Sequence, residues 1–176
     1  MKKYILLLLL YFFSASSFSQ NIIFQDNFEK GKLNKAWKIA GQSTVANLEN
    51  EGIKPPADGN NFALKTLGNA QITLDVPVEN TSVPVTTQCT FNYWIHYIHS
   101  KVTVNILFLN SNGTFISSAN LGDLAEKAGW DLFNQKVDIP AGSSIMQLKL
   151  LVARASSTAG NSVYFQSICF GCNRRR

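Results

Sequence analysis

The sequence has few of the residues on which enzyme active sites depend. It contains two histidines, His96 and His99, and both fall in one stretch of alternating apolar and polar residues. Residues three apart on a strand point to opposite faces, so these two side chains cannot bind one metal from that strand. There is no Gly-x-Ser-x-Gly motif for a nucleophilic serine. The 11 acidic residues are scattered, whereas glycosidase chemistry needs two carboxyl groups flanking the bond. The sequence favours a binding protein over an enzyme.

Excess positive charge is also missing from the body of the chain. Of the 16 basic residues, Lys2 and Lys3 begin the sequence and Arg174, Arg175 and Arg176 end it. The remaining 11 are matched by 11 acidic residues, so the net charge of +5 comes from the two ends. One local cluster remains, made of Lys30, Lys32, Lys35 and Lys38. A solvated loop explains it, and nucleic-acid binding needs cations clustered on a folded surface. We expect no nucleic-acid partner.

Long apolar runs are absent except near the start. Two lysines precede the continuous apolar run Tyr4–Phe13, and small polar residues follow it. This order is typical of a secretory signal peptide, and Ser17 and Ser19 suit its cleavage site. The run is about half the ~20 residues that span a bilayer, so we expect no transmembrane segment. We predict a signal peptide over residues 1–19 and a protein secreted to the periplasm, cell surface or medium.

The mature chain has the length of one domain with a sizeable core. It shows no internal repeat and no low-complexity linker. We therefore predict a single domain over residues 20–170. Residues 171–176 form a basic C-terminal tail, for which a solvated end is the simplest account.

Alternation of apolar and polar residues dominates the mature chain. Six segments show it: Gln71–Val78, Thr90–Ile98, Lys101–Leu109, Leu132–Ile139, Ile145–Ala153 and Ser162–Phe170. A period of two predicts strands with one buried face, the antiparallel pattern. Turn signals rich in Gly, Pro and Asn separate them, and only Gly122–Gly129 suggests a short helical turn. We predict an all-β fold in which two antiparallel sheets pack as a β-sandwich of jelly-roll type.

Several motifs resemble one family in order along the chain. They are "DNFEKGKLNKAW" (26–37), "DGNNFALKT" (58–66), "WDLFNQKVDIPAGSSIMQLKLLV" (130–152) and "NSVYFQSICF" (161–170). Their sequence resembles that of secreted carbohydrate-binding modules with the galactose-binding-like jelly roll, which commonly open on Phe-Glu-x-Gly followed by Trp. The resemblance implies a non-catalytic module that binds carbohydrate. The Asp-x-Phe-Glu opening is shared by MAM-type adhesion domains, which leaves that family open.

The resemblance also implies a structural calcium site. In the family the Phe-Glu region contributes to it, together with an acidic residue on the last strand. Here Asn27 and Glu29 match the first part, and their oxygens suit calcium. Gln166 stands where the family usually carries Asp, which removes a charge and weakens the site. In the alternative, Glu29 caps the following turn and Asn27 bonds the backbone.

The polar faces of three predicted strands carry a candidate ligand site. Its residues are Asn92, Trp94, His96, Asn105, Gln147 and Lys149. If the strands are neighbours, these side chains place an aromatic ring beside amides and a cation. Sugars bind such surfaces, with the ring on the aromatic side chain and the hydroxyls on the polar groups. In the alternative, Trp94 belongs to the core, as most sandwich Trp residues do.

The three cysteines, Cys89, Cys169 and Cys172, are an odd number for an exported protein. One of the two terminal cysteines can bridge to Cys89 in an oxidising compartment, and spacing does not decide which.

Two other functions remain open. The first is a structural or adhesive domain that contacts an extracellular protein through the same sheet. The second is a small polysaccharide lyase, for which His96, Tyr97 and Lys149 are present.

Overall fold

The computed structural model describes residues 21–57, 60–78, 87–98, 100–124, 127–154 and 162–173. The predicted signal peptide and Arg174–Arg176 lie outside these residues. Within the described part of the chain, no helix is long and apolar enough to cross a membrane.

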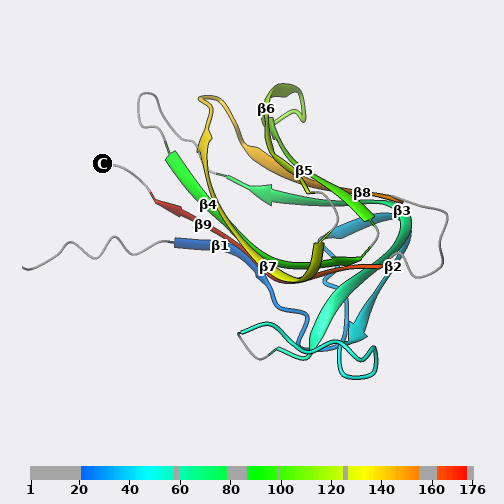
Figure 1. The fold of residues 1–176 in the computed structure, drawn as a ribbon. Helices are drawn as coiled ribbons and strands as arrows, with labels where there is room; N and C mark the ends of the chain where they lie inside the picture. Colours follow the sequence, from blue (N-terminus) through cyan, green and yellow to red (C-terminus); the bar gives the residue numbers. More distant parts are fainter. Residues whose placement is uncertain are drawn as a thin grey trace, which may run out of the picture.

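The described residues form nine strands (Figure 1). They are β1 (Asn21–Asp26), β2 (Trp37–Asn47), β3 (Phe62–Pro77), β4 (Thr87–Ile98), β5 (Ser100–Leu109), β6 (Phe115–Leu124), β7 (Lys127–Ile139), β8 (Ile145–Arg154) and β9 (Ser162–Asn173). The last strand continues three residues past the expected domain end at Phe170, so the start of the predicted basic tail is part of the sheet.

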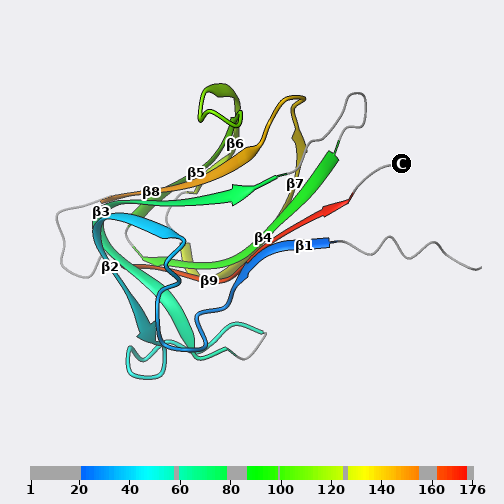
Figure 2. The same ribbon diagram turned by 180° about the vertical axis from the view of Figure 1, so that it is seen from behind.

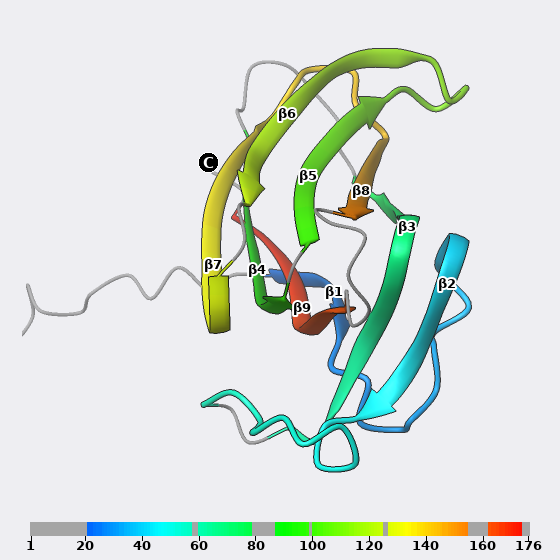
Figure 3. The ribbon, with the colours of Figure 1, turned by 45° about the vertical axis from the view of Figure 1, so that its right-hand side comes forward.

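The strands form two layers that face each other (Figures 1 and 2). Strands β6, β5 and β8 pair in that order, and β8 pairs with the second half of β3, from Ala70 to Pro77. In the other layer, β7, β4 and β9 pair in that order, and β9 pairs with β1 and with the first half of β3. The long strand β3 therefore belongs to both layers. Strands β6 and β7 lie at the edges (Figure 3). All described pairings are antiparallel, as the sequence predicts.

The core lies between the layers and is built from the apolar positions of the alternating strands. The fully buried positions include Ile72 and Leu74 of β3, Phe91, Tyr93 and Ile95 of β4, Val102, Val104 and Ile106 of β5, and Met146, Leu148 and Leu150 of β8. This confirms the predicted register on these strands. Each such side chain contributes roughly 1.5–3 kcal/mol to folding when it leaves water.

Three strands, β1, β2 and β6, lie outside the six predicted segments, and one expected turn is absent. Strand β2 contains Gly41 at a register shift, where a Cβ would lie 2.7 Å from that of Ala70, and most of its side chains are partly exposed. Strand β6 is an edge strand with two register shifts, and nearly all its side chains are exposed or partly exposed. Neither strand therefore shows clear alternation. The expected helical turn at Gly122–Gly129 is wrong in its described residues, which belong to β6 and β7.

The opening motif closes one end of the sandwich. The Asp26 carboxylate accepts hydrogen bonds from the Phe28 amide (3.0 Å) and from Trp37 Nε1 (2.8 Å). Phe28 has a φ of 58° and is 1% exposed, so the turn drives its ring into the core beside Trp37. Phe28, in the Phe-Glu sequence that follows the first strand, thus closes one end of the core.

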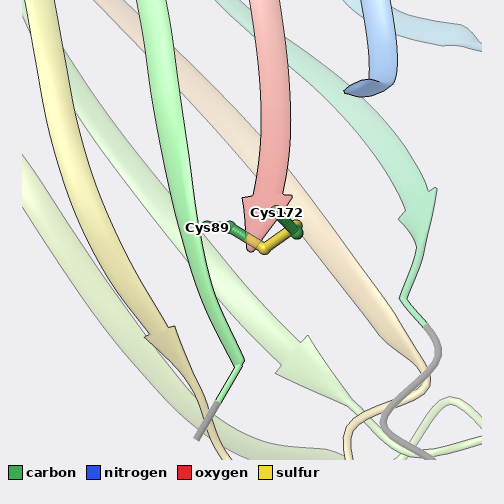
Figure 4. Close-up of a disulfide and its surroundings, with 2 residues drawn as sticks. All are labelled: Cys89 and Cys172. Carbon is green, nitrogen blue, oxygen red and sulfur yellow. A yellow bond between two sulfur atoms is a disulfide. The ribbon is translucent and has the colours of Figure 1, made fainter. Parts of the chain in front are cut away.

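A disulfide joins Cys89 of β4 to Cys172 of β9 (Figure 4). The two residues are direct cross-strand partners, whereas Cys169 pairs with Asn92 and is the free cysteine. The sequence left the choice between Cys169 and Cys172 open, and the strand register settles it. The bridge closes a loop with a sequence separation of 83 residues.

We predict that replacing both Cys89 and Cys172 by Ser lowers the free energy of unfolding by roughly 2–5 kcal/mol, because a cross-link over a long loop restricts the unfolded chain. Urea denaturation of the two proteins measures the difference. Cys169→Ser is the matched control and should change stability little. A double variant as stable as the wild type would contradict the prediction.

Candidate functional site

The structure divides the six predicted ligand residues between two opposite faces. Asn92, Trp94 and His96 project from β4 on the outside of one layer. Asn105 of β5, with Gln147 and Lys149 of β8, lies on the outside of the other layer. The sequence could not show this, because the two layers have similar alternation. The six residues therefore form two candidate surfaces.

The first surface, here called the β4–β7 face, consists of cross-strand pairs. Asn92 lies opposite Asn134, Trp94 opposite Leu132, and His96 opposite Trp130. Trp94 is half-buried and outside the core, and Leu132 beside it is 55% exposed. The side chains of Asn92, Asn134 and Trp94 make no hydrogen bond to any other residue that the structure describes. The side chains of Trp94 and Leu132 therefore lie beside two amides that are free to hydrogen-bond a ligand.

The loop 48–57 bounds one end of this face. Leu48 and Ile53 pack on Tyr164 and Trp130, and Trp130 Nε1 donates to the Lys54 carbonyl over 2.7 Å. The Trp130 side chain therefore packs on this loop and hydrogen-bonds to it. Trp94, one pair along the strands, is the aromatic ring left for a ligand.

An ion pair secures the same loop. The Lys65 ammonium donates to the Glu51 carboxylate over 2.6 Å, and the Tyr164 hydroxyl donates to the same oxygen over 3.2 Å. The hydrogen bond from Lys65 holds the pKa of Glu51 below its ordinary value. Burial raises the pKa of Tyr164, so this phenol stays protonated at neutral pH. Glu51, Lys65 and Tyr164 are not among the predicted site residues, because only the folded chain brings them together.

His96 lies between these aromatic rings. Its ring centroid is 5.3 Å from that of Trp130 and 5.9 Å from that of Tyr164. Its Nδ1 atom is buried without a hydrogen-bond partner among the described residues. Burial lowers the pKa of His96 below its usual 6.5, so the folded protein holds the neutral imidazole.

This shift predicts a loss of stability in weak acid. The contribution of neutral His96 is fully present above the unfolded-state pKa of 6.5 and is lost as the pH falls through the lower folded-state pKa. We expect the melting temperature to fall by a few degrees between pH 7 and pH 5.5, measured by circular dichroism. In His96→Gln this part of the pH dependence should disappear. An unchanged pH profile in the variant would contradict the assignment to His96.

The second surface, here called the β5–β8 face, is more polar. Asn105 and Thr73 flank Lys149 from the two neighbouring strands. Asp75 accepts hydrogen bonds from Lys38 and Gln147, each over 2.6 Å. Although burial opposes them, these bonds hold the pKa of Asp75 below its ordinary value. Because Gln147 is bound to Asp75, the Asn105 and Lys149 side chains are the groups here without a described hydrogen bond, although the Lys149 charge also helps to lower the pKa of Asp75.

The predicted calcium residues do not form an oxygen shell. Glu29 is exposed, and its amide donates to Asn27 Oδ1 over 3.4 Å, so the Asn27 side chain bonds the backbone as in the alternative. No described hydrogen bond shows the Glu29 side chain capping the turn. Gln166 is fully buried, but its Nε2 donates to the carbonyl oxygens of Asn60 (2.5 Å) and Phe62 (3.0 Å). Among the described residues no three acidic, His or Cys side chains gather at one point. The groups present do not fit a calcium ion.

The residues considered for lyase chemistry do not meet either. His96 lies on the β4–β7 face and Lys149 on the β5–β8 face, on opposite sides of the molecule. The side chain of Tyr97 is outside the described part.

The free thiol, Cys169, is half-buried, and burial raises its pKa, which keeps it protonated and unreactive at neutral pH.

No protein-family model matches the sequence, and no curated protein matches it. Solved structures do match. The enzymatically active domain of bacteriophage CBA120 tailspike protein 4 has a TM-score of 0.64 at 11% identity, over 83% of this chain; the chain spans 20% of that protein.

Smaller neighbours match over nearly their full length. The CBM22-1 xylan-binding domain of Paenibacillus barcinonensis Xyn10C has a TM-score of 0.58 at 13% identity, covering 92% of this chain and 100% of the domain. TmCBM61, solved with β-1,4-galactotriose, has a TM-score of 0.53 at 16% identity, covering 85% of this chain and 94% of that one. These likenesses confirm the predicted fold, an all-β sandwich of jelly-roll type, which these solved carbohydrate-binding modules also have.

Proposed function

We propose that this protein is a non-catalytic carbohydrate-binding module that uses the β4–β7 face. The observation that carries the proposal is the position of Trp94, which lies outside the core beside Leu132 and the unbonded amides of Asn92 and Asn134. The apolar face of a sugar ring stacks on an aromatic ring, and the hydroxyls bond to amides that no protein group occupies.

The chemistry of this face supports a neutral polysaccharide. The side chains next to Trp94 on this face, Asn92, Leu132 and Asn134, carry no charge, and burial lowers the pKa of His96. Beyond Asn92, away from the loop 48–57, the same face continues over Thr90 opposite Lys136 and Gln88 opposite Asp138, which gives an extended chain further contacts. Fold neighbours whose names record xylan or galactotriose provide the first polymers to test.

We predict that Trp94→Ala weakens polysaccharide binding about tenfold or more, the loss typical of a central aromatic contact. Affinity electrophoresis in gels containing β-1,4-xylan or β-1,4-galactan, followed by a glycan array, measures it. Trp94→Phe keeps part of the stacking surface and should bind with intermediate strength.

The matched control is the double variant Asn105→Ala/Lys149→Ala on the opposite face. It should bind as the wild type does. If the control loses binding and Trp94→Ala keeps it, the ligand face is the β5–β8 face. If the wild type binds no glycan and instead purifies with an extracellular protein, the adhesive function replaces the proposal. Release of reducing or unsaturated ends would identify an enzyme.

We also propose that the protein acts after export. The basic and apolar start of the sequence supports this, and so does the Cys89–Cys172 disulfide, which persists in oxidising compartments. Mass spectrometry of protein recovered outside the cytoplasm should find a chain that begins at Gln20. A full-length chain kept in the cytoplasm would contradict this.

A further inference from the structure

Gln166 occupies an unusual position for an amide. It lies on the outer side of β9, opposite Trp94 in the register, yet it is 0% exposed because the segment Asn60–Phe62 covers it. The next residue, Ser167, has a φ of 50° and lies at a register shift between β4 and β9. This irregularity lets β9 turn the Gln166 amide toward the covering segment while Ile168 returns to the core.

The amide serves as the positive partner of two carbonyl groups. Gln166 Nε2 donates to the Asn60 oxygen over 2.5 Å and to the Phe62 oxygen over 3.0 Å, so both carbonyls point at one atom. Asn60 extends the arrangement: its Nδ2 donates to the Asn27 carbonyl, and its Oδ1 accepts from the Phe62 amide over 3.1 Å. Two amide side chains thus tie together β9, the start of β3 and the turn after β1.

Backbone carbonyl oxygens are among the ligands of calcium, which takes 6–8 oxygens, and two carbonyls of the segment Asn60–Phe62 converge here. Here the centre of convergence is an NH₂ group, which carries partial positive charge and no net charge. The other atom of the same amide, Gln166 Oε1, is buried without a described hydrogen-bond partner. A cation at this place would have to displace the NH₂ group.

We propose that the Gln166 and Asn60 amides take the place of a structural calcium ion, so that the fold of this protein is independent of calcium. The carbonyls of Asn60 and Phe62 nevertheless keep a geometry that accepts a cation. The single substitution Gln166→Glu should therefore make this link between β9 and the start of β3 dependent on calcium.

The test compares melting temperatures in EDTA and in millimolar calcium chloride. The wild type should melt at the same temperature in both, and calorimetric titration should detect no calcium binding. Gln166→Glu keeps the side-chain size but turns a carboxylate toward two carbonyl oxygens. In EDTA it should melt roughly 10 °C lower, the effect of an uncompensated buried charge, and calcium should restore most of the loss.

Gln166→Met is the matched control, since it fills similar space without a donor or a charge. It should be destabilised to the same extent in EDTA and in calcium. A wild type that binds calcium, or that EDTA destabilises, would overturn the proposal. So would a Gln166→Glu variant that calcium does not rescue, including one that fails to fold in calcium, because the carbonyls would then be unable to hold a cation.

Discussion

The whole fold depends on one strand that is hydrogen-bonded in both layers. The first half of β3 pairs with β9 through Leu67, and the second half pairs with β8 from Ala70 onward. Between them Gly68 adopts a φ of 64°, a conformation that favours glycine, and β2 follows β3 through the bend with its own glycine at Gly41. This seam fixes how the two sheets face each other, and it therefore fixes which side chains are left outside.

The two outer faces differ because their neighbours differ. On one side the loop 48–57 folds over the end of the sheet, where Trp130 and Tyr164 hold it and His96 is partly covered. Trp94 lies where the part of the sheet that the loop covers ends and the uncovered part begins. On the other side, Asp75 gathers Lys38 and Gln147 into a hydrogen-bonded group without an aromatic ring. Trp94 beside two unbonded amides favours the first face for ring stacking. On the second face Leu107 and Leu151 lie among the polar groups, and the exposed ring of Phe115 lies at the edge strand β6.

Strands that bury one full face could be predicted from the sequence alone. Alternation in β3, β4, β5 and β8 gave the core positions correctly, because every second residue there is apolar and points inward, while Trp94, Leu107 and Leu151 lie on the outer sides. Alternation did not identify β2 and β6, because register shifts interrupt it there and the side chains of both strands are largely exposed. It also could not assign strands to layers, so residues of opposite faces were joined into one candidate patch. Alternation reports which side of a strand is buried and carries no information about which sheet the strand belongs to.

The local roles of polar residues were predicted least well. Asp26 bonds Trp37, 11 residues away, and Gln166 bonds carbonyls more than 100 residues away. Such contacts depend on the register of strands that are distant in the sequence. Only the family resemblance pointed to position 166, and it did so by marking a departure from the usual acidic residue.

The place of β9 in the strand order has a consequence for how the chain matures. The final strand lies in the middle of its layer, between β4 and the pair formed by β1 and β3. Until residue 173 has left the ribosome, those strands lack their shared neighbour and the layer cannot close. For a chain exported as we propose above, this strand order keeps the layer open until β9 has been synthesised, a state that a translocation channel accepts.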